Sequence, residues 1–280
     1  MTSPDSSRPA PDQFMDRATA LLAAPEVVDA GRGIDPHALF QLYLADGLLE
    51  AVEWANDGVG SDEAACMWLA SLRWHRTVTG SFPAGAPEPL ARWIDGELSG
   101  ARQALLPADP GLVSVLSRTE MGTPQRPHHD AGAPGWALLG ATVPGLLPHV
   151  SPGTRRKLSV DAAALVAPKS AYDTAALVGP AVFEILSAAE PLDTLGDLAA
   201  QAPDDAPGAV LRAAAQSAAA HPASADAAAA LETPAARLLA AALCGAARGT
   251  GALPEGWDRH PGSAVVLSAA QQWRGLVFAA

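Results

Sequence analysis

The chain has 280 residues, of which 49% are hydrophobic and 17% are charged, so it has enough apolar material for one large core. Its 18 basic and 30 acidic residues give a formal net charge of −12. Such a surface repels phosphate backbones, so we expect no nucleic-acid partner.

The sequence carries no obvious targeting pattern. The N-terminal segment MTSPDSSRPAPDQF lacks the charged start and apolar centre of a secretory signal, and no run of about eighteen apolar residues suggests a membrane span. The two cysteines, Cys66 and Cys244, lie inside apolar helical runs and cannot form a disulfide framework. We therefore expect a cytoplasmic protein with no membrane partner, and the sequence does not indicate its oligomeric state.

Aromatic residues are few, at 5%, while alanine is abundant and β-branched runs are short. This composition favours helices over sheet, so the sequence predicts an all-α fold. Residues 1–14 are rich in Ser, Pro and Asp and are predicted to form a disordered N-terminal tail. Residues 15–280 are predicted to form a single all-α domain.

Two helices are predicted in the first third of the chain, over residues 36–54 and 61–80, because apolar residues recur there at helical spacing. The second helix begins with Ser61 as its N-cap, followed by two acidic residues, and ends at Gly80.

The middle of the chain is less regular. Residues 81–89 are predicted to form a loop, and residues 90–106 a short helix. Glycine and proline are frequent between residues 118 and 148. This frequency predicts a long ordered surface loop, and long loops of this kind often carry function.

Helical patterns return in the second half of the chain. We expect a kink or break at Gly179–Pro180, and short, peripheral, mobile pieces in the alanine-rich residues 191–230. The predicted helices here cover residues 153–168, 170–190, 231–257 (a helix followed by a turn) and 263–280.

Four segments carry more specific patterns. They are ADGLLEAVEW, SDEA at residues 61–64, MGTPQRPHHDAGAPGWALLGATVPGLL, and AALCGAARGTGALPEGW. In this order they resemble motifs of the ADP-ribosylglycohydrolase family. The matching residues in the first and third segments are Asp46, Leu48, Val52, Glu53, Trp54, Gly122, Thr123, Pro127, Asp130 and Gly135. The resemblance implies an all-helical fold whose active members hold two Mg²⁺ ions and cleave ADP-ribose from proteins or small molecules.

The resemblance also implies a metal site, which this chain fills incompletely. The family's Thr-Asp-Asp-Thr is replaced by Ser61-Asp62-Glu63-Ala64, and its Asp-Thr-Asp-Thr by Glu232-Thr233-Pro234-Ala235. Proline and alanine offer no side-chain oxygen, whereas Mg²⁺ requires oxygen ligands. We therefore expect at most one Mg²⁺ ion, with Ser61, Asp62, Glu63, Glu232 and Thr233 as the candidate ligands.

Candidate catalytic and substrate-binding residues follow from the same resemblance. Glu53 and Asp62 are the candidate catalytic acids. Asp130, Gly135 and Trp136 are the candidate substrate-binding residues, and the bulk of Trp136 is expected to narrow the diphosphate side of the cleft.

Each candidate also has a purely structural interpretation. Ser61-Asp62-Glu63 is an ordinary helix entrance, and Thr233-Pro234 is a preferred pair for starting a helix. Glu53 could be a half-exposed residue at a helix end. The pair His128-His129 could bind a metal with Asp130, but adjacent histidines in such a loop more often face solvent.

Two hypotheses of function remain. We favour a protein of the glycohydrolase type that has lost catalysis and binds ADP-ribose, a nucleotide or a protein partner. The alternative is a divergent Mg²⁺-dependent hydrolase that cleaves an N- or O-glycosidic ADP-ribosyl bond in an ADP-ribosylated protein, with Glu53 or a metal-bound water supplying the base or nucleophile.

Overall fold

The computed structural model describes residues 10–28, 31, 33–128 and 134–278. These residues form thirteen α-helices and, besides turns and short 3₁₀ segments, only two isolated β-bridges, which confirms the predicted all-α fold. The helices are α1 (Pro11–Val28), α2 (Pro36–Asn56), α3 (Glu63–Thr79), α4 (Trp93–Glu97), α5 (Pro110–Leu116), α6 (Pro134–Gly140), α7 (Pro152–Ala164), α8 (Tyr172–Ser187), α9 (Pro191–Gln201), α10 (Ala206–Ala220), α11 (Ser224–Ala229), α12 (Pro234–Arg248) and α13 (Ser263–Val277).

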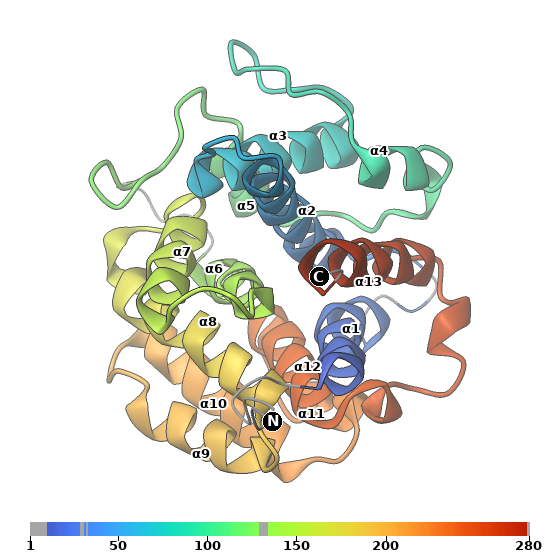
Figure 1. Cartoon of the computed structure of the whole chain (residues 1–280), viewed down its shortest axis with the longest axis vertical. Coiled ribbons are helices and arrows are strands. Elements are labelled where there is room, and N and C mark those ends of the chain that lie inside the picture. The colour runs from blue at the N-terminus through green and yellow to red at the C-terminus, as the bar shows by residue number, and fades with distance from the viewer. Residues whose placement is uncertain (1–9, 29–30, 32, 129–133, 279–280) are drawn as a thin grey trace, which may run out of the picture.

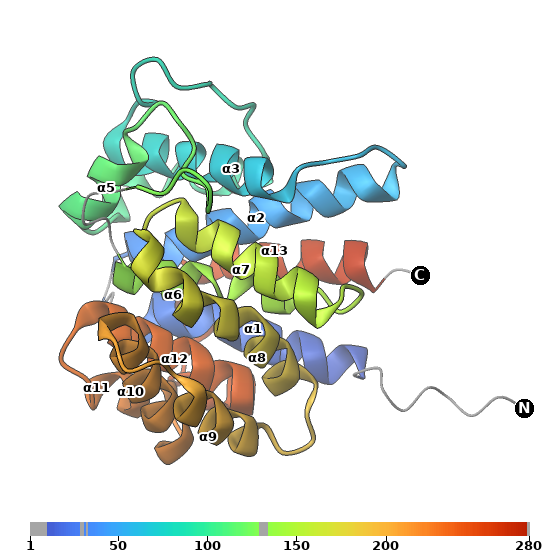
Figure 2. The ribbon, with the colours of Figure 1, turned by 90° about the vertical axis from the view of Figure 1, so that its left-hand side faces the viewer.

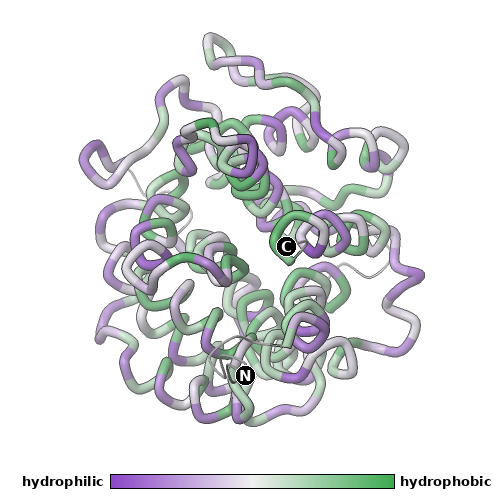
Figure 3. The backbone as a smooth tube through the Cα atoms, viewed as in Figure 1, coloured by the Kyte–Doolittle hydropathy of each residue, from purple (hydrophilic) through white to green (hydrophobic). Residues whose placement is uncertain are grey.

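The helices pack in layers along the long axis of the molecule. Figure 1 shows α3, α4 and α5 at one end and α9, α10 and α11 at the other. Figure 2 shows the same order from the side, with α1, α2, α7 and α13 between the two ends. Many hydrophobic residues lie in α1, α2 and α12, whereas many hydrophilic residues lie in the outer loops (Figure 3).

Helix α12 lies at the centre of the lower half, packed against α1, α10 and α11. Every residue from Leu238 to Ala247 is buried. A Cβ atom at Gly245 would lie 2.5 Å from the carbonyl oxygen of Ala20, so only glycine allows α12 to approach the α1 backbone this closely. The alanine-rich sequence of α12 therefore serves close helix packing, and the helix predicted at 231–257 is confirmed.

Helices α2 and α3 form the second close pair. Every residue from Ala38 to Leu49 is buried. A Cβ atom at Gly47 would lie 2.6 Å from the carbonyl oxygen of Cys66, so the two backbones touch here as well. Both helices were predicted from their apolar spacing. Gly80, in the left-handed region at φ 99°, ends α3 as expected.

The prediction of one surface loop over residues 118–148 was wrong in its second half. Every residue from Trp136 to Leu147 is buried, and this stretch forms α6 and a 3₁₀ segment at Val143–Leu146. The run WALLGATVPGLL is buried in spite of its glycine and proline residues, because burying its apolar side chains removes much apolar surface from water. Residues 129–133 lie outside the described residues.

Arg155 of α7 fixes the end of this buried stretch. Its guanidinium carbon lies 3.4 Å from the ring centroid of Phe183, and its Nε and Nη2 atoms donate to the carbonyl oxygen of Leu147 at 2.9 and 2.7 Å. Burial lowers the pKa of Arg155 to about 10. The side chain thus satisfies backbone carbonyls where the chain leaves the core.

Two further predictions in the second half need correction. Helix α8 continues through Pro180, so of the expected kink or break at this position the break is wrong. The preceding Gly179 packs so closely on α7 that a Cβ atom would collide with Ser159 Oγ. Residues 191–230 form α9, α10 and α11, not only short peripheral pieces, and α10 buries Leu211 and three alanines between α9 and α12.

The N-terminal helix was not predicted from the sequence. Helix α1 begins at Pro11, inside the range 1–14 expected to form a disordered tail, and Phe14 is fully buried against Phe183 and Phe278. Residues 1–9 of that range lie outside the described residues.

A buried carboxyl group joins the end of α1 to the starts of α2 and α13. The Glu26 side chain is 1% exposed, and its Oε1 atom accepts a hydrogen bond from the backbone N–H of Asp35 at 3.2 Å and lies 3.6 Å from Nδ1 of His260. Burial, with the negative charge of Asp35, raises the pKa of Glu26 well above its ordinary value. Burial lowers the pKa of His260, so both side chains favour their neutral forms.

We expect Glu26→Gln to become more stabilising, relative to the wild type, as pH rises from 5 to 9. A raised folded-state pKa means that the stability contributed by the neutral carboxyl is present below its unfolded pKa and is lost as pH rises through its folded pKa. Glutamine stays neutral throughout. The measurement is the free energy of unfolding in urea at each pH, with the exposed Glu255→Gln as the control. A difference between Glu26→Gln and wild type that does not change with pH would contradict this account.

Candidate functional site

A buried ion pair lies at the centre of the α2–α3 layer. Asp46 has a side-chain exposure of 0%, and Arg73 of 1%. Arg73 Nη2 donates to Asp46 Oδ2 at 2.5 Å, and Arg92 Nε donates to the two carboxylate oxygens of Asp46 at 2.9 and 3.0 Å. Burial raises the pKa of Asp46, against the opposing effect of the two arginines. Two cations therefore contact this buried carboxylate, and Arg73 also lies 3.6 Å from carboxylate oxygens of Glu50 and Asp95.

The same Arg92 also holds Glu53, the candidate catalytic acid. Its Nη1 and Nη2 atoms donate to Oε2 and Oε1 of Glu53 at 2.9 and 3.0 Å, which is a bidentate pair. The Glu53 side chain is 33% exposed. Burial lowers the pKa of Arg92, but the hydrogen bonds that it donates to Glu53 and the charge of Asp46 outweigh this effect and raise that pKa above its usual range. Both carboxylate oxygens of Glu53 are thus engaged within the protein.

The network continues to Asp95 at the start of α4. Asp95 accepts hydrogen bonds from Arg76 Nη2 at 3.0 Å, from the Tyr43 hydroxyl at 3.1 Å and from the backbone N–H of Arg92 at 2.8 Å. Burial raises the pKa of Tyr43, so its hydroxyl stays a donor. Through these contacts the network fastens the segment before α4 onto α2 and α3. Sequence reasoning missed Arg73 and Arg92, although a carboxylate inside an apolar helix signals a buried cationic partner.

The retained acids at the start of α3 serve as a helix cap. Asp62 Oδ1 accepts from the backbone N–H groups of Ala64 and Ala65 at 3.0 and 3.1 Å. Ser61 instead donates its hydroxyl to the carbonyl oxygen of Ala51 at 3.2 Å. The predicted N-cap at Ser61 was therefore wrong by one residue, because aspartate caps as well as serine does.

A lysine lies within the field of these acids. Lys157 Nζ of α7 donates to Asp161 Oδ2 at 2.7 Å. This hydrogen bond raises the pKa of Lys157 although burial opposes it, and the charges of Asp161, Glu63 and Asp62 add to the rise. Lys157 thus places an ammonium group within the electrostatic influence of Asp62 and Glu63.

The second half of the predicted metal site lies at the start of α12. Glu232 and Thr233 are both exposed. Thr233 has N-cap backbone geometry with Pro234 in the first helical turn, although its side chain makes no capping hydrogen bond. A Cβ atom at Gly135 would lie 2.6 Å from the Cβ of Ala235, so this end of α12 packs against α6. The position that the resemblance assigns to a metal ligand is thus an apolar contact.

Trp136, a candidate substrate-binding residue, is stacked inside the protein. Its ring lies 3.8 Å from that of His37 with an angle of 11° between the planes, and the residue is 7% exposed. His37 in turn is held by Asp35 at Nδ1 and by the backbone N–H of Asp109 at Nε2. Trp136 therefore covers His37. Asp130 lies outside the described residues.

The predicted ligands do not fit a magnesium ion. Within the described ranges, no group of three or more His, Cys, Asp or Glu side chains is placed to hold a metal. Asp62 caps its own helix, and the start of α12 offers only Glu232 and Thr233 at the surface. Mg²⁺ requires near-octahedral oxygen coordination, which this arrangement does not supply.

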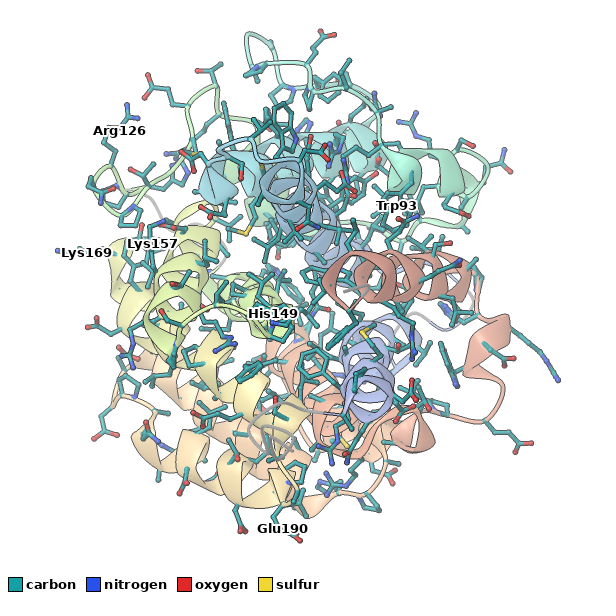
Figure 4. The ribbon with its side chains drawn as sticks, in the orientation of Figure 1. Trp93, Arg126, His149, Lys157, Lys169 and Glu190 are labelled. Carbon is teal, nitrogen blue, oxygen red and sulfur yellow. The ribbon has the colours of Figure 1, made fainter. Side chains whose placement is uncertain are left out.

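A cationic cavity of about 310 Å³ lies in the first half of the 118–148 stretch. His128, expected to face solvent, is 8% exposed and lies with its Nδ1 3.2 Å from Arg118 Nη1. Figure 4 shows Arg126 at the outer edge of the molecule, on the same side in that view as Lys157 and Lys169. The cavity is lined by Arg118, Thr119, Glu120, Met121, Arg126, Pro127 and His128.

A wider groove of about 600 Å³ between α9 and α10 has few side chains that could bind a ligand. It is lined mainly by alanine and glycine, and its Arg212 is paired with Asp204 at 2.8 Å.

Comparison with known proteins adds no family assignment: no family model matches the chain, and no curated protein matches it. Among the described helices, none is long and apolar enough to cross a membrane.

We expect Arg73→Met to lower the free energy of unfolding by about 3–5 kcal/mol, because it leaves the buried Asp46 carboxylate with only one cation. Urea denaturation measures the change. The matched control is Arg274→Met, which removes a 53%-exposed cation from the exposed Asp12 and should cost under about 1 kcal/mol. Adding Asp46→Asn to Arg73→Met should recover part of the loss. Equal effects of Arg73→Met and Arg274→Met would argue against the buried pair as the main constraint.

Proposed function

We propose that the chain is a divergent ADP-ribosylglycohydrolase-like protein that binds an ADP-ribose-type diphosphate without cleaving it. The observation that carries the proposal is the bidentate pair between Arg92 and Glu53. A general base must accept a proton from the reacting group. Two charge-assisted hydrogen bonds from Arg92 stabilise the ionised carboxylate of Glu53 and so make it a weaker base.

The other acids of the resemblance support the same conclusion. Asp62 is used as a helix cap, and Lys157 already places an ammonium group in the field of Asp62 and Glu63. Ala235, at the start of α12, packs against Gly135. The residues that mark the resemblance therefore stabilise the fold, and we derive no catalytic step from them.

The binding half of the proposal rests on the cavity of Arg118–His128. The chain as a whole carries a net charge of −12, whereas this hollow is lined by two arginines and one acidic residue, Glu120, so Arg126 offers an anion a local positive charge. Guanidinium groups bind phosphate oxygens with two parallel hydrogen bonds. A cavity of about 310 Å³ suits the diphosphate and part of an attached nucleoside.

Calorimetric titration of the full chain with ADP-ribose tests the binding. We expect binding that is the same in Mg²⁺ and in EDTA, and about 10-fold weaker in Arg126→Ala, because a hydrogen bond to a charged group contributes about 1.5–3 kcal/mol. Arg259→Ala, an exposed arginine elsewhere on the surface, is the matched control and should bind normally. No binding, or equal weakening by both substitutions, would overturn the proposed site.

Catalysis is tested separately. With ADP-ribosylated arginine and serine as substrates, we expect no release of ADP-ribose with or without Mg²⁺. Mg²⁺-dependent release that is abolished by Asp62→Ala would replace the proposal with the divergent hydrolase.

A further inference from the structure

His75 near the end of α3 and Ser117 after α5 form a hydrogen-bonded pair. Nε2 of His75 lies 3.0 Å from Oγ of Ser117, and Nδ1 lies 3.0 Å from the carbonyl oxygen of Ser81. His75 is 5% exposed, whereas Ser117 is exposed. Three separate segments thus bring a buried imidazole to a hydroxyl group at the surface.

The Ser81 carbonyl determines which nitrogen of His75 can accept a proton. A carbonyl oxygen is only an acceptor, so the neutral imidazole must carry its hydrogen on Nδ1. Nε2 then has a free lone pair directed at Ser117. The Ser117 hydroxyl donates its proton to the carbonyl oxygen of Val113 at 2.7 Å, and that carbonyl also accepts the backbone N–H of Ser117 at 3.0 Å. The hydroxyl proton can therefore pass to Nε2 without leaving Val113 unsatisfied.

The surroundings of Ser117 place it beside the cationic cavity. The next residue, Arg118, lines the cavity together with Arg126. The loop that carries Ser81 also lies against this region, since a Cβ atom at Gly85 would be 3.3 Å from Thr119 Cγ2. An anionic molecule held by the cavity would contact the residues that directly follow Ser117 in the chain.

We propose that Ser117 is a nucleophile, with His75 as its general base and the Ser81 carbonyl as the group that orients the base, and that this site transfers the acyl group of a small anionic carboxylic ester. A nucleophile, a base within hydrogen-bond reach and a third group orienting the base are the arrangement that activates a serine. The inference does not depend on ADP-ribose binding or on the glycohydrolase resemblance.

The reaction balances without any cofactor. Ser117 Oγ attacks the ester carbonyl carbon while His75 Nε2 takes the hydroxyl proton. The bond from the carbonyl carbon to the leaving alkoxide breaks, and the alkoxide receives that proton from His75. Water then hydrolyses the acyl-serine, which releases the carboxylic acid and restores the hydroxyl.

A fluorophosphonate probe tests the nucleophile on the full chain. Attack forms an oxygen–phosphorus bond and expels fluoride, and peptide mass mapping locates the adduct. We expect labelling at Ser117 and not at Ser114, an exposed serine one turn earlier on α5. Labelling should disappear in Ser117→Ala, persist in Ser114→Ala, and slow about 100-fold in His75→Gln.

Several results would overturn the inference. These are equal labelling of Ser114 and Ser117, no labelling of Ser117 in the wild type, or an unchanged rate in a folded His75→Gln protein. The mapping of the wild-type chain needs no variant, so the test holds even where His75→Gln fails to fold.

The acyl specificity is tested with two chromogenic esters. Mono-p-nitrophenyl succinate carries a carboxylate, and p-nitrophenyl acetate is neutral. We expect a burst of about one p-nitrophenolate per chain, the fingerprint of an acyl-serine, that is faster with the succinate. Arg126→Ala should remove the preference, whereas Arg259→Ala, at an exposed arginine elsewhere on the surface, should keep both the preference and the acetate burst. Equal rates for the two esters in the wild type would overturn the anionic substrate, and the absence of any burst would overturn acyl transfer.

Discussion

The carboxylate of Asp46 is the constraint on which the upper half of the molecule depends. It lies inside a helix whose residues from Ala38 to Leu49 are all buried, where an unpaired charge would cost several kcal/mol. Arg73 compensates it from the neighbouring helix, but the second cation, Arg92, comes from beyond the loop that follows α3. The need to compensate one buried charge therefore fixes the course of the chain between α3 and α4.

The same constraint decides what Glu53 can do. A guanidinium group has five donors, and Arg92 uses only its Nε on Asp46. The two remaining nitrogens point toward the end of α2, where they meet Glu53. The candidate base is in this way tied to the residue that stabilises the core. A proton taken up by Glu53 would weaken its charge-assisted pair with Arg92, the residue that also holds the segment before α4.

Local sequence patterns predicted much of the helical fold. They could not predict features that depend on contacts between residues far apart in the chain. Helices α2, α3 and α12 follow from apolar spacing and their end residues, but the burial of Trp136–Leu147 was hidden behind glycine and proline. The cap at Asp62 was misplaced because serine and aspartate cap equally well. Asp46 indicates that a cation must be near, yet nothing local shows that it is Arg73 and Arg92. His75 and Ser117 belong to no motif, so only the fold brings them together.

Helix α3 contacts both ends of the loop between α3 and α4, and it does so through opposite faces. Arg73 and His75 are two residues apart, which at 3.6 residues per turn places them about 200° apart around the helix. The charge network around Asp46 and the Ser117–His75 pair are therefore chemically separate although they share one helix. They still act on one loop, because His75 holds its first residue, Ser81, while Asp46 holds Arg92 at its far end. The orientation of the imidazole toward Ser117 thus depends on a loop whose other end is secured by the buried carboxylate.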